Sequence, residues 1–476
     1  MSQITPQIPI DILYEILEHI EDDRMTLFSC LLVNHIWCKI SVRILWKNIQ
    51  NFDTLVACLP NESIEKLRRI SVYVTTPTKP LLFNYAIFVK YFSFDDINDK
   101  IGMFTGFFTS SVRKLIMLEI FVMLLNQATL KNLNIRLKQI PSIDFSSYPK
   151  ATNCLKDLTK ISYRSDLCSD FLMQMSRFCQ NIRSMDVKLK SNISEGVLEL
   201  ISSQKNLKKF RVVLLNCENL EVLIPLLTKH SSSTLIKLEI DTIQITEPFT
   251  ILNKFLNLNE LILKYHSGHL DTLQPITFSK LRNLKFKRDV PKYEYMIKFL
   301  RINGYGLEVL EFGCYCHNLL NLAISEFCRN LRSLGTIFIK DEGETLLSIL
   351  KNCQNLQSIH LIRSDDRYLE VKQIFEIIAK HSPKTFSELK LNFGINSNLS
   401  PIDLDNFFKN WSTAMINKWR WSAFQKPWLA LQANFPIESI YHLELANEAI
   451  KVAKMNRISR WKNFKAQFNY VDLKMV

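Results

Sequence analysis

A short apolar pattern recurs along most of this 476-residue chain at a nearly constant spacing. The pattern is apolar-x-x-apolar-x-apolar, and its clear copies begin 23 to 30 residues apart. Such a period predicts a stacked repeat architecture, because one unit of this size cannot bury its apolar side alone. The nine clear copies are Ile182-Met185-Val187, Leu207-Phe210-Val212, Leu235-Leu238-Ile240, Leu258-Leu261-Leu263, Leu281-Leu284-Phe286, Leu307-Leu310-Phe312, Leu331-Leu334-Thr336, Leu356-Ile359-Leu361 and Phe386-Leu389-Leu391.

Each copy predicts a short strand, because its last residues alternate between apolar and polar side chains. The segments between copies have helical periodicity, for example residues 344–350 and 370–380. We therefore expect an α/β solenoid with parallel strands inside and helices outside. Weaker copies upstream are Leu67-Ile70-Val72, Val89-Phe92-Phe94, Val112-Leu115-Met117 and Leu130-Leu133-Ile135, while Leu155-Leu158 keeps half of the pattern.

Motifs of known catalytic sites are missing from the sequence. Only 10 residues are glycine, which disfavours Gly-rich phosphate loops, and Gly304-Tyr305-Gly306 lacks the third glycine of a dinucleotide loop. The sequence has no Walker A, zinc-protease or nucleophile-elbow motif, and its nine histidines are dispersed. We expect a protein that is not an enzyme, with no catalytic residues and no cofactor.

Two clusters could suggest metal binding. Cys314-Tyr315-Cys316-His317 lacks a second Cys or His pair nearby, which favours a core or loop segment over a zinc site. The acids of Asp95-Asp96-Ile97-Asn98-Asp99 lack the Gly and the late Glu of a calcium loop, which favours a helix start or a loop. We predict no metal site.

The first fifty residues differ from the rest in charge, with six acids against four bases in a chain of net charge +14. An apolar stripe from Ile12 to Ile20 predicts a first helix over residues 10–20, with Pro9 ahead of it. Leu27, Leu31 and the apolar cluster from Val33 to Trp37 predict a second helix, and a third ends near Trp46. Three short helices make a small core, so we expect an apolar face left over for a partner or the next domain.

This segment resembles an F-box. The resemblance rests on Ile8-Pro9-x-Asp11-Ile12-Leu13-x-x-Ile16, then Leu27, then Cys30-Leu31-Leu32-Val33-Asn34-x-x-Trp37, and finally Leu45-Trp46. Ile8 replaces the usual Leu, and Asn34 replaces the usual Cys. The resemblance implies docking on the adaptor Skp1 and, through it, on a cullin-RING ubiquitin ligase. The implied docking positions are Pro9, Ile12, Leu13, Ile16, Leu17, Leu31, Leu32, Val33 and Trp37. The alternative is that these residues are only the core of a small helical domain.

The repeats resemble the cysteine-containing class of leucine-rich repeats, which often follows an F-box. Cys179-Gln180-Asn181-Ile182, Cys328-Arg329-Asn330-Leu331 and Cys353-Gln354-Asn355-Leu356 share the same phase. We expect these cysteines to be small buried hydrophobes. The predicted organisation is an F-box-like docking domain over residues 1–50, a degenerate leucine-rich-repeat solenoid over 51–409, and a Trp-rich basic helical cap over 410–476.

The predicted cap holds five of the seven tryptophans, and residues 451–465 contain six bases and no acid. One interpretation is that the tryptophans cover the open end of the solenoid while the lysines face solvent, since a terminal repeat must hide its apolar end. The other is a basic helix that binds nucleic acid, an anionic membrane or an acidic partner. We favour the first.

Together the two resemblances imply the substrate-recognition subunit of an SCF-type (Skp1-cullin-F-box) E3 ubiquitin ligase, which holds a protein target for ubiquitination and degradation. The basic excess outside the first fifty residues suggests an acidic or phosphorylated target. Outward strand residues that could contact it are Lys208, Arg211, Lys237, Glu239, Lys264, Lys285, Lys287 and Glu311. The rival interpretation is a non-catalytic basic scaffold for nucleic acid or an anionic partner, with the F-box as an assembly tag.

Eleven cysteines scattered along so long a chain do not resemble a disulfide framework. The N-terminus lacks the basic and apolar regions of a secretory signal, and the apolar stretch over residues 115–125 is far too short to span a bilayer. We expect reduced thiols, no membrane span, and a cytoplasmic or nuclear location.

Overall fold

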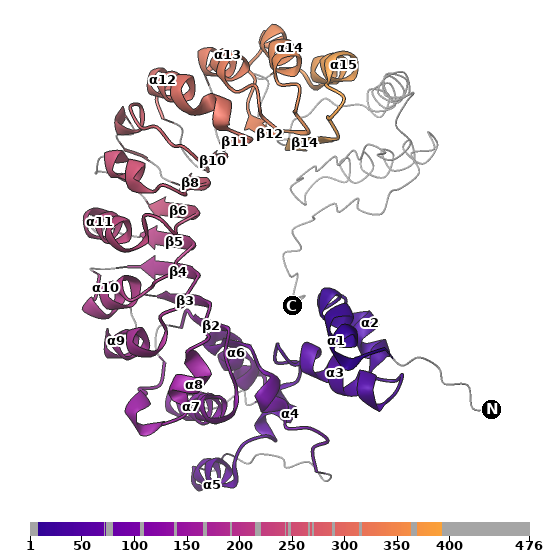
Figure 1. Ribbon diagram of the computed structural model, residues 1–476, viewed down its shortest axis with the longest axis vertical. Coiled ribbons are helices and arrows are strands. Elements are labelled where there is room, and N and C mark those ends of the chain that lie inside the picture. Colours follow the sequence, from indigo (N-terminus) through magenta and orange to yellow (C-terminus); the bar gives the residue numbers. More distant parts are fainter. Residues whose placement is uncertain are drawn as a thin grey trace, which may run out of the picture. The chain divides into compact units, whose positions relative to one another are not determined.

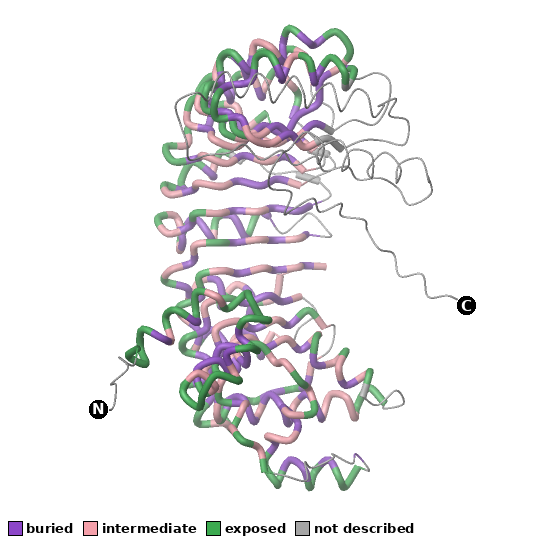
Figure 2. The backbone as a smooth tube through the Cα atoms, turned by 90° about the vertical axis from the view of Figure 1, so that its right-hand side faces the viewer, coloured by how far each residue is buried: buried purple, intermediate pink, exposed green. Residues whose placement is uncertain are grey.

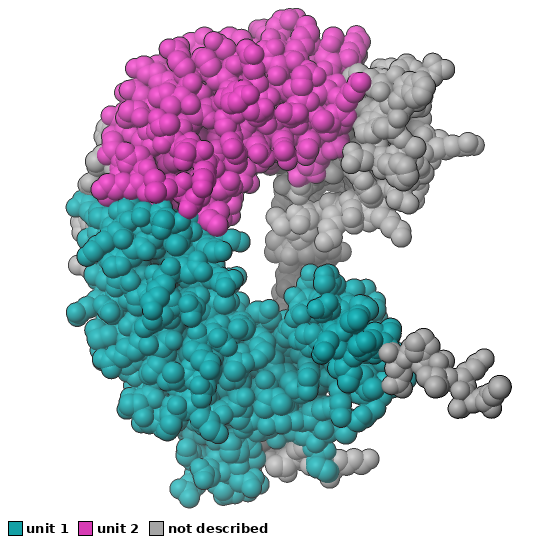
Figure 3. Space-filling view, in the orientation of Figure 1, with its two compact units in different colours: residues 1–235 teal, residues 236–476 magenta. Residues whose placement is uncertain are grey.

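The computed structural model describes residues 8–392, with gaps at residues 71, 73–79, 105–108, 138–139, 165–168, 191–192, 215–219, 243, 246–248, 265–266, 269–270, 288–290, 314–316 and 363–368. Contacts within the chain divide it into two compact units, unit 1 (residues 1–235) and unit 2 (residues 236–476), which are coloured separately in Figure 3. The boundaries predicted at residues 50 and 409 are not tested by this division. The predicted cap over residues 410–476 lies outside the described residues, as does Cys314-Tyr315-Cys316.

Unit 1 begins with three short helices, α1 (Ile10–His19), α2 (Arg24–Cys30) and α3 (His35–Leu45), as expected. The prediction that one helix runs from Leu27 through Trp37 is wrong, because the chain turns between α2 and α3. Asn34 explains the break: its Oδ1 accepts hydrogen bonds from the backbone N–H groups of Ile36 (2.9 Å) and Trp37 (3.1 Å). An amide that satisfies these otherwise unpaired donors starts a new helix.

The remainder of unit 1 alternates strands with helices. Its elements are α4 (Phe52–Val56), α5 (Asn61–Arg69), η1 (Tyr85–Phe88), β1 (Tyr91–Ser93), α6 (Phe94–Phe104), α7 (Ser110–Gln127), β2 (Asn132–Ile135), η2 (Phe145–Ser147), α8 (Ala151–Leu155), β3 (Lys160–Arg164), α9 (Ser169–Phe178), β4 (Ser184–Leu189), α10 (Glu195–Ser202), β5 (Lys209–Leu214) and α11 (Leu220–Ser231). The strands pair in parallel in the order β1-β2-β3-β4-β5.

Unit 2 continues the alternation. Its elements are β6 (Lys237–Thr242), β7 (Gln244–Ile245), η4 (Phe249–Lys254), β8 (Glu260–Lys264), β9 (Ser267–Gly268), η5 (Asp271–Leu273), β10 (Asn283–Phe286), α12 (Tyr293–Asn303), η6 (Gly304–Gly306), β11 (Val309–Phe312), α13 (Asn318–Phe327), β12 (Ser333–Thr336), α14 (Gly343–Asn352), β13 (Ser358–Ile362), α15 (Val371–His381) and β14 (Glu388–Asn392). Strands β6-β8-β10-β11-β12-β13-β14 are parallel, and β7 pairs with β9 separately. Helices α9 to α11 of unit 1 lie along one side of its strands, and helices α12 to α15 of unit 2 lie along one side of theirs (Figure 1).

The recurring apolar pattern determines which side of each strand is buried. The strand register places pattern residues opposite one another, for example Met185 beside Phe210 in unit 1 and Leu284 beside Leu310 in unit 2. These side chains are 0 to 1% exposed. Buried residues alternate with partly exposed ones along the strands (Figure 2), because successive side chains point to opposite faces. The structure thus confirms the predicted fold class, an α/β leucine-rich-repeat solenoid of parallel strands with flanking helices.

Three of the weaker upstream assignments are wrong. Leu67-Ile70-Val72 begins inside α5, and Val112-Leu115-Met117 lies inside α7, whose buried residues include Ile116, Ile120 and Leu124. A buried helix carries the same apolar density as a buried strand, so the pattern alone does not separate them. The half-copy Leu155-Leu158 is out of phase with β3. The residues that fit the pattern there are Leu158, Ile161 and Tyr163, which are 0 to 1% exposed on and just before the strand.

Side chains at the strand starts tie each repeat to the one before it. Cys353 donates from Sγ to the carbonyl oxygen of Cys328 (3.3 Å), and both cysteines are fully buried, as expected. At the same phase Gln204 replaces cysteine: its Nε2 donates to the carbonyl of Cys179 (2.7 Å), and its Oε1 accepts from the N–H of Ile182 (2.9 Å). These contacts satisfy the carbonyl groups of Cys328 and Cys179 and the N–H of Ile182 between stacked repeats, where an unpaired donor or acceptor would be costly.

Candidate functional site

Helix α1 divides its apolar residues between a buried and an exposed face. Leu13 and Leu17 are 3% and 1% exposed and belong to the core of the helical segment, whereas Ile12 and Ile16 are 50% and 49% exposed. Pro9 is exposed just before the helix, where its fixed backbone angle suits a helix start. One half of the predicted α1 docking set is therefore core, and the other half is available to a partner.

The turn between α2 and α3 is also apolar and exposed. Leu32 and Val33 are 88% and 57% exposed, while Leu31 and Trp37 are half-buried. A turn normally carries small or polar residues. Here two adjacent branched aliphatic residues expose most of their surface to solvent instead.

Several further exposed apolar residues of the same helices are not among the predicted docking positions. They are Ile8 and Ile10 before and at the start of α1, Met25 and Phe28 on α2, and Ile36 on α3, with exposures from 39 to 77%. The i, i+3, i+7 spacing of Met25, Phe28 and Leu32 could have revealed a further stripe. We call the whole set the N-terminal apolar surface: Ile8, Ile10, Ile12, Ile16, Met25, Phe28, Leu32, Val33 and Ile36.

A network of polar contacts joins these helices to the first strand. The carbonyl oxygen of Lys47 accepts from the N–H groups of Lys90 (2.9 Å) and Tyr91 (3.0 Å), and Asn48 forms a parallel bridge with Tyr91. Lys47 Nζ contacts Glu18 (2.6 Å) and Glu21 (2.7 Å).

The charge of Lys47 is held firmly by these contacts. Burial alone would lower the pKa of Lys47, but the hydrogen bonds and negative charges of Glu18 and Glu21 outweigh it and raise that pKa to about 12. The ammonium group therefore stays protonated, and its two ion pairs persist, across the whole neutral pH range.

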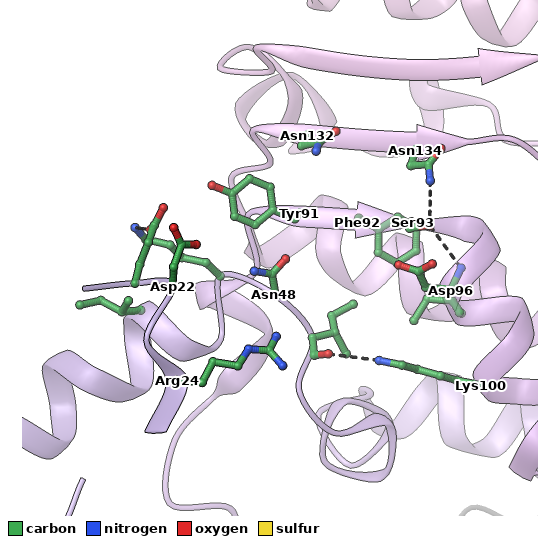
Figure 4. Close-up of a pocket in the computed structure, with 15 residues that line it drawn as sticks. Asp22, Arg24, Asn48, Tyr91, Phe92, Ser93, Asp96, Lys100, Asn132 and Asn134 are labelled. Carbon is green, nitrogen blue, oxygen red and sulfur yellow. Dashed lines mark hydrogen bonds and ion pairs between the residues drawn. The ribbon is translucent and has the colours of Figure 1, made fainter. Parts of the chain in front are cut away.

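A pocket of about 560 Å³ lies beside this joint (Figure 4). Its lining combines Asp22 and Arg24 with Asn48, the residues of β1, Asp96 and Lys100 of α6, and two asparagines of β2. Lys100 Nζ donates to the carbonyl of Ile49 (3.1 Å). The acidic and basic groups of the pocket balance, and the described residues contain no cluster of three His, Cys, Asp or Glu side chains that could hold a metal ion.

The eight residues predicted to contact a target lie at or beside strands, but most are engaged with each other. Arg211 contacts Asp186 (3.2 Å), and in unit 2 Lys237 pairs with Glu260 (2.9 Å) and Lys264 with Glu239 (2.7 Å). Glu311 on β11 pairs with Lys285 on β10 and with Lys287 just after it. Lys208 forms no ion pair with any residue that the structure describes.

The pKa of Glu311 reflects the strength of the ion pairs on β10 and β11. Burial by itself would raise the pKa of Glu311, but the hydrogen bond and charge of Lys287 (2.5 Å), with Lys285 at 3.4 Å, hold that pKa below its usual value. Of the eight predicted residues, those on β6, β8, β10 and β11 form local ion pairs, so this face offers little uncompensated positive charge.

The buried cysteines are unsuited to nucleophilic chemistry. Burial raises the pKa of the Cys154 thiol to about 11 and that of Cys353 to about 12, and it raises those of Cys179 and Cys328 as well. The reactive species of cysteine is the thiolate, which these environments disfavour. Among the helices described, none has the length and apolar character to cross a bilayer.

No protein-family model and no curated protein sequence matches this chain. Similar solved structures include the complex of Rad7 and Elc1 from yeast, at 13% identity and a TM-score of 0.36, covering 74% of this chain and 97% of that one. Another is the leucine-rich repeat-containing protein LegL7 from Legionella pneumophila, at 12% identity and a TM-score of 0.30, covering 67% of this chain and 90% of that one. The complex of TLR13 with ssRNA13 follows at 12% identity and a TM-score of 0.29, covering 66% and 43%. These likenesses are partial, and the leucine-rich-repeat fold is established by the repeating strands and helices of the chain itself.

Proposed function

We propose that this protein is the substrate-recognition subunit of an SCF-type E3 ubiquitin ligase. In this proposal the N-terminal helices form an F-box that docks on Skp1, and through Skp1 on a cullin-RING ligase. The solenoid holds a protein target. The chain itself performs no chemistry and needs no cofactor, because it acts by bringing the lysines of the target close to a separate ubiquitin-loaded enzyme.

The observation that carries the proposal is the N-terminal apolar surface. Its nine residues expose between 39 and 88% of their area on a segment of about thirty residues, whereas the pattern residues of the repeats are almost fully buried. Large apolar residues that are exposed together on one short segment are typical of an interaction site. Of the docking positions that the F-box resemblance implies, Ile12, Ile16, Leu32 and Val33 are exposed and belong to this surface, and Pro9 is exposed next to it in the chain.

A receptor that works by proximity needs a firm connection between its two binding parts. The backbone hydrogen bonds from Lys90 and Tyr91 to Lys47, together with the packing of Trp46 on Tyr85 at 4.5 Å between ring centroids, fix the helical segment on β1 within unit 1. This connection supports the proposal, because a flexible joint would lower the effective concentration of the target at the transferring enzyme.

The test is binding of purified full-length chain to Skp1 by calorimetry, with the triple variant Ile12→Gln, Ile16→Gln, Leu32→Gln. These side chains face solvent, so the fold is expected to survive. Each substitution removes an interface side chain and should cost more than about 1 kcal/mol of binding free energy. Together the three should weaken the affinity for Skp1 by roughly a hundredfold or more.

The matched control is Val222→Gln, Ile302→Gln, Leu322→Gln, which removes three apolar side chains of similar exposure (45 to 48%) from α11, α12 and α13. It should bind Skp1 as the wild type does. Failure of the wild type to bind Skp1 at micromolar concentrations, or equal weakening by the control, would contradict the proposal.

A further inference from the structure

The starts of three neighbouring strands in unit 1 carry a row of basic side chains. The N–H of Arg183 donates to the carbonyl of Thr159 (2.8 Å), and the N–H of Lys208 donates to the carbonyl of Arg183 (2.9 Å). These bonds place the starts of β3, β4 and β5 side by side, at the spacing of roughly 4.8 Å between paired strands. We call the basic set the strand-start edge: Lys160, Arg183, Lys205, Lys208 and Lys209.

The strand-start edge is not neutralised by the protein. Four of its five side chains are exposed, Lys208 is half-buried, and none has a carboxylate partner among the residues that the structure describes. Asp157 is the one acid in segments 155–160, 179–184 and 204–209, and it contacts Lys131 (3.7 Å).

Three bases at strand starts of unit 2 are paired with acids instead. Lys237 pairs with Glu260 (2.9 Å), and Glu308 lies between Arg282 (3.9 Å) and Arg332 (3.4 Å). Lys237, Arg282 and Arg332 are thus matched by acids on a neighbouring repeat. The unmatched charge of unit 1 is a property of that part of the chain and does not follow from the repeat architecture.

The positions and the types of the bases at the strand-start edge indicate which kind of ligand it suits. A row of bases across three strands suits charge that is distributed along a line, whereas a single phosphate would need donors that converge on one point. Four of the five bases are lysines, whose flexible point charges tolerate variable spacing better than the planar arginine fork does. Segments 155–160, 179–184 and 204–209 contain no aromatic residue. Single-stranded nucleic acid is usually held by aromatic side chains that stack on its bases, so the edge favours a polypeptide.

We propose that the strand-start edge of unit 1 binds an extended segment rich in aspartate and glutamate on the target protein. In an extended peptide alternate side chains point the same way, about 6.8 Å apart, which lysine side chains can reach from adjacent strand starts. This inference rests on the proposed function, since it names the chemistry of the target that the receptor would hold. The proposed contact surface thus differs from the one predicted from the sequence, whose residues on β6, β8, β10 and β11 are engaged in ion pairs.

The test measures binding of full-length chain to a fluorescent peptide of alternating glutamate and serine, by anisotropy at about 50 mM salt, where surface charges are weakly screened. The same peptide with glutamine in place of glutamate, and an oligouridylate of equal length, are the comparison probes. The variant Arg183→Gln, Lys208→Gln, Lys209→Gln should weaken binding of the acidic peptide about tenfold.

The matched control, Lys351→Gln, Lys372→Gln, Lys380→Gln, removes the same charge from exposed positions on α14 and α15. It should change the affinity less than twofold. Equal weakening by the control, equal binding of the glutamine peptide, or tighter binding of the oligouridylate would overturn the inference.

Skp1 binding is measured on the same preparations to separate the two proposals. The edge variant should bind Skp1 normally. Loss of Skp1 binding by the wild type with intact peptide binding would sink only the F-box proposal, and the reverse result would sink only the acidic-segment inference.

Discussion

The N-terminal helices and the repeats use apolar residues in opposite ways. In the repeats, the pattern residues of neighbouring strands fill one shared interior, and the opposite face of the strands carries charges that pair across repeats. In α1, α2 and the turn after α2, a small core around Leu13, Leu17 and Leu27 leaves other large apolar residues in solvent. Neighbouring repeats cover each other's apolar residues, whereas the helical segment keeps several of its large apolar residues exposed.

The largest expected difference between the two regions is in the stability that is lost when one apolar side chain is shortened. Phe312 is fully buried and stacks on Phe286 with 5.6 Å between ring centroids, so Phe312→Ala should cost about 3 to 5 kcal/mol of unfolding free energy. Leu32 is 88% exposed, and Leu32→Ala should change the same quantity by less than about 0.5 kcal/mol. Urea unfolding followed by circular dichroism measures both. Similar costs at the two positions would refute the contrast.

A smaller loss of stability is expected when the side chain of Asn34, which caps α3 after the exposed turn, is removed. Asn34→Ala removes the acceptor for the N–H groups of Ile36 and Trp37 and should cost about 1 kcal/mol, while Asn34→Ser keeps an acceptor and should cost much less. Hydrogen exchange of these two amides measures the local effect. Unchanged exchange rates in Asn34→Ala would show that α3 does not depend on this cap.

The smallest effect concerns the paired charges of the repeats. The pKa of Glu311 in the folded protein is below its ordinary value of 4.5, so its carboxylate stabilises the fold above that pH and loses this contribution as the pH falls through the folded pKa. Glu311→Gln should therefore lower stability by roughly 0.5 kcal/mol at neutral pH, with no difference from wild type in strong acid. Denaturation across a pH series checks this, with Glu376→Gln on the exposed side of α15 as the control. A difference that persists in strong acid would contradict the ion-pair explanation.

The repeat pattern predicted the strands well because burial of one face constrains every second side chain. All nine clear copies coincide with strands β4 to β6, β8 and β10 to β14. The pattern failed where a buried helix has the same apolar density, as at Val112 in α7, and where the phase was ambiguous, as at Leu155. The docking positions that the F-box resemblance implies lie on the segment that carries the N-terminal apolar surface, but the resemblance did not separate exposed Ile12 from buried Leu13.

The sequence by itself determined the repeat period, the buried residues of the clear copies and the number of N-terminal helices, because local periodicity decides which side chains can leave water together. The tertiary structure alone decided which charges are paired. Lys287 and Glu311 are 24 residues apart in the chain and meet only through the register of β10 and β11. The pairing of β4 with β5 likewise brings Arg183 beside Lys208, and neither has a carboxylate partner among the described residues, because ion pairing depends on neighbours in space.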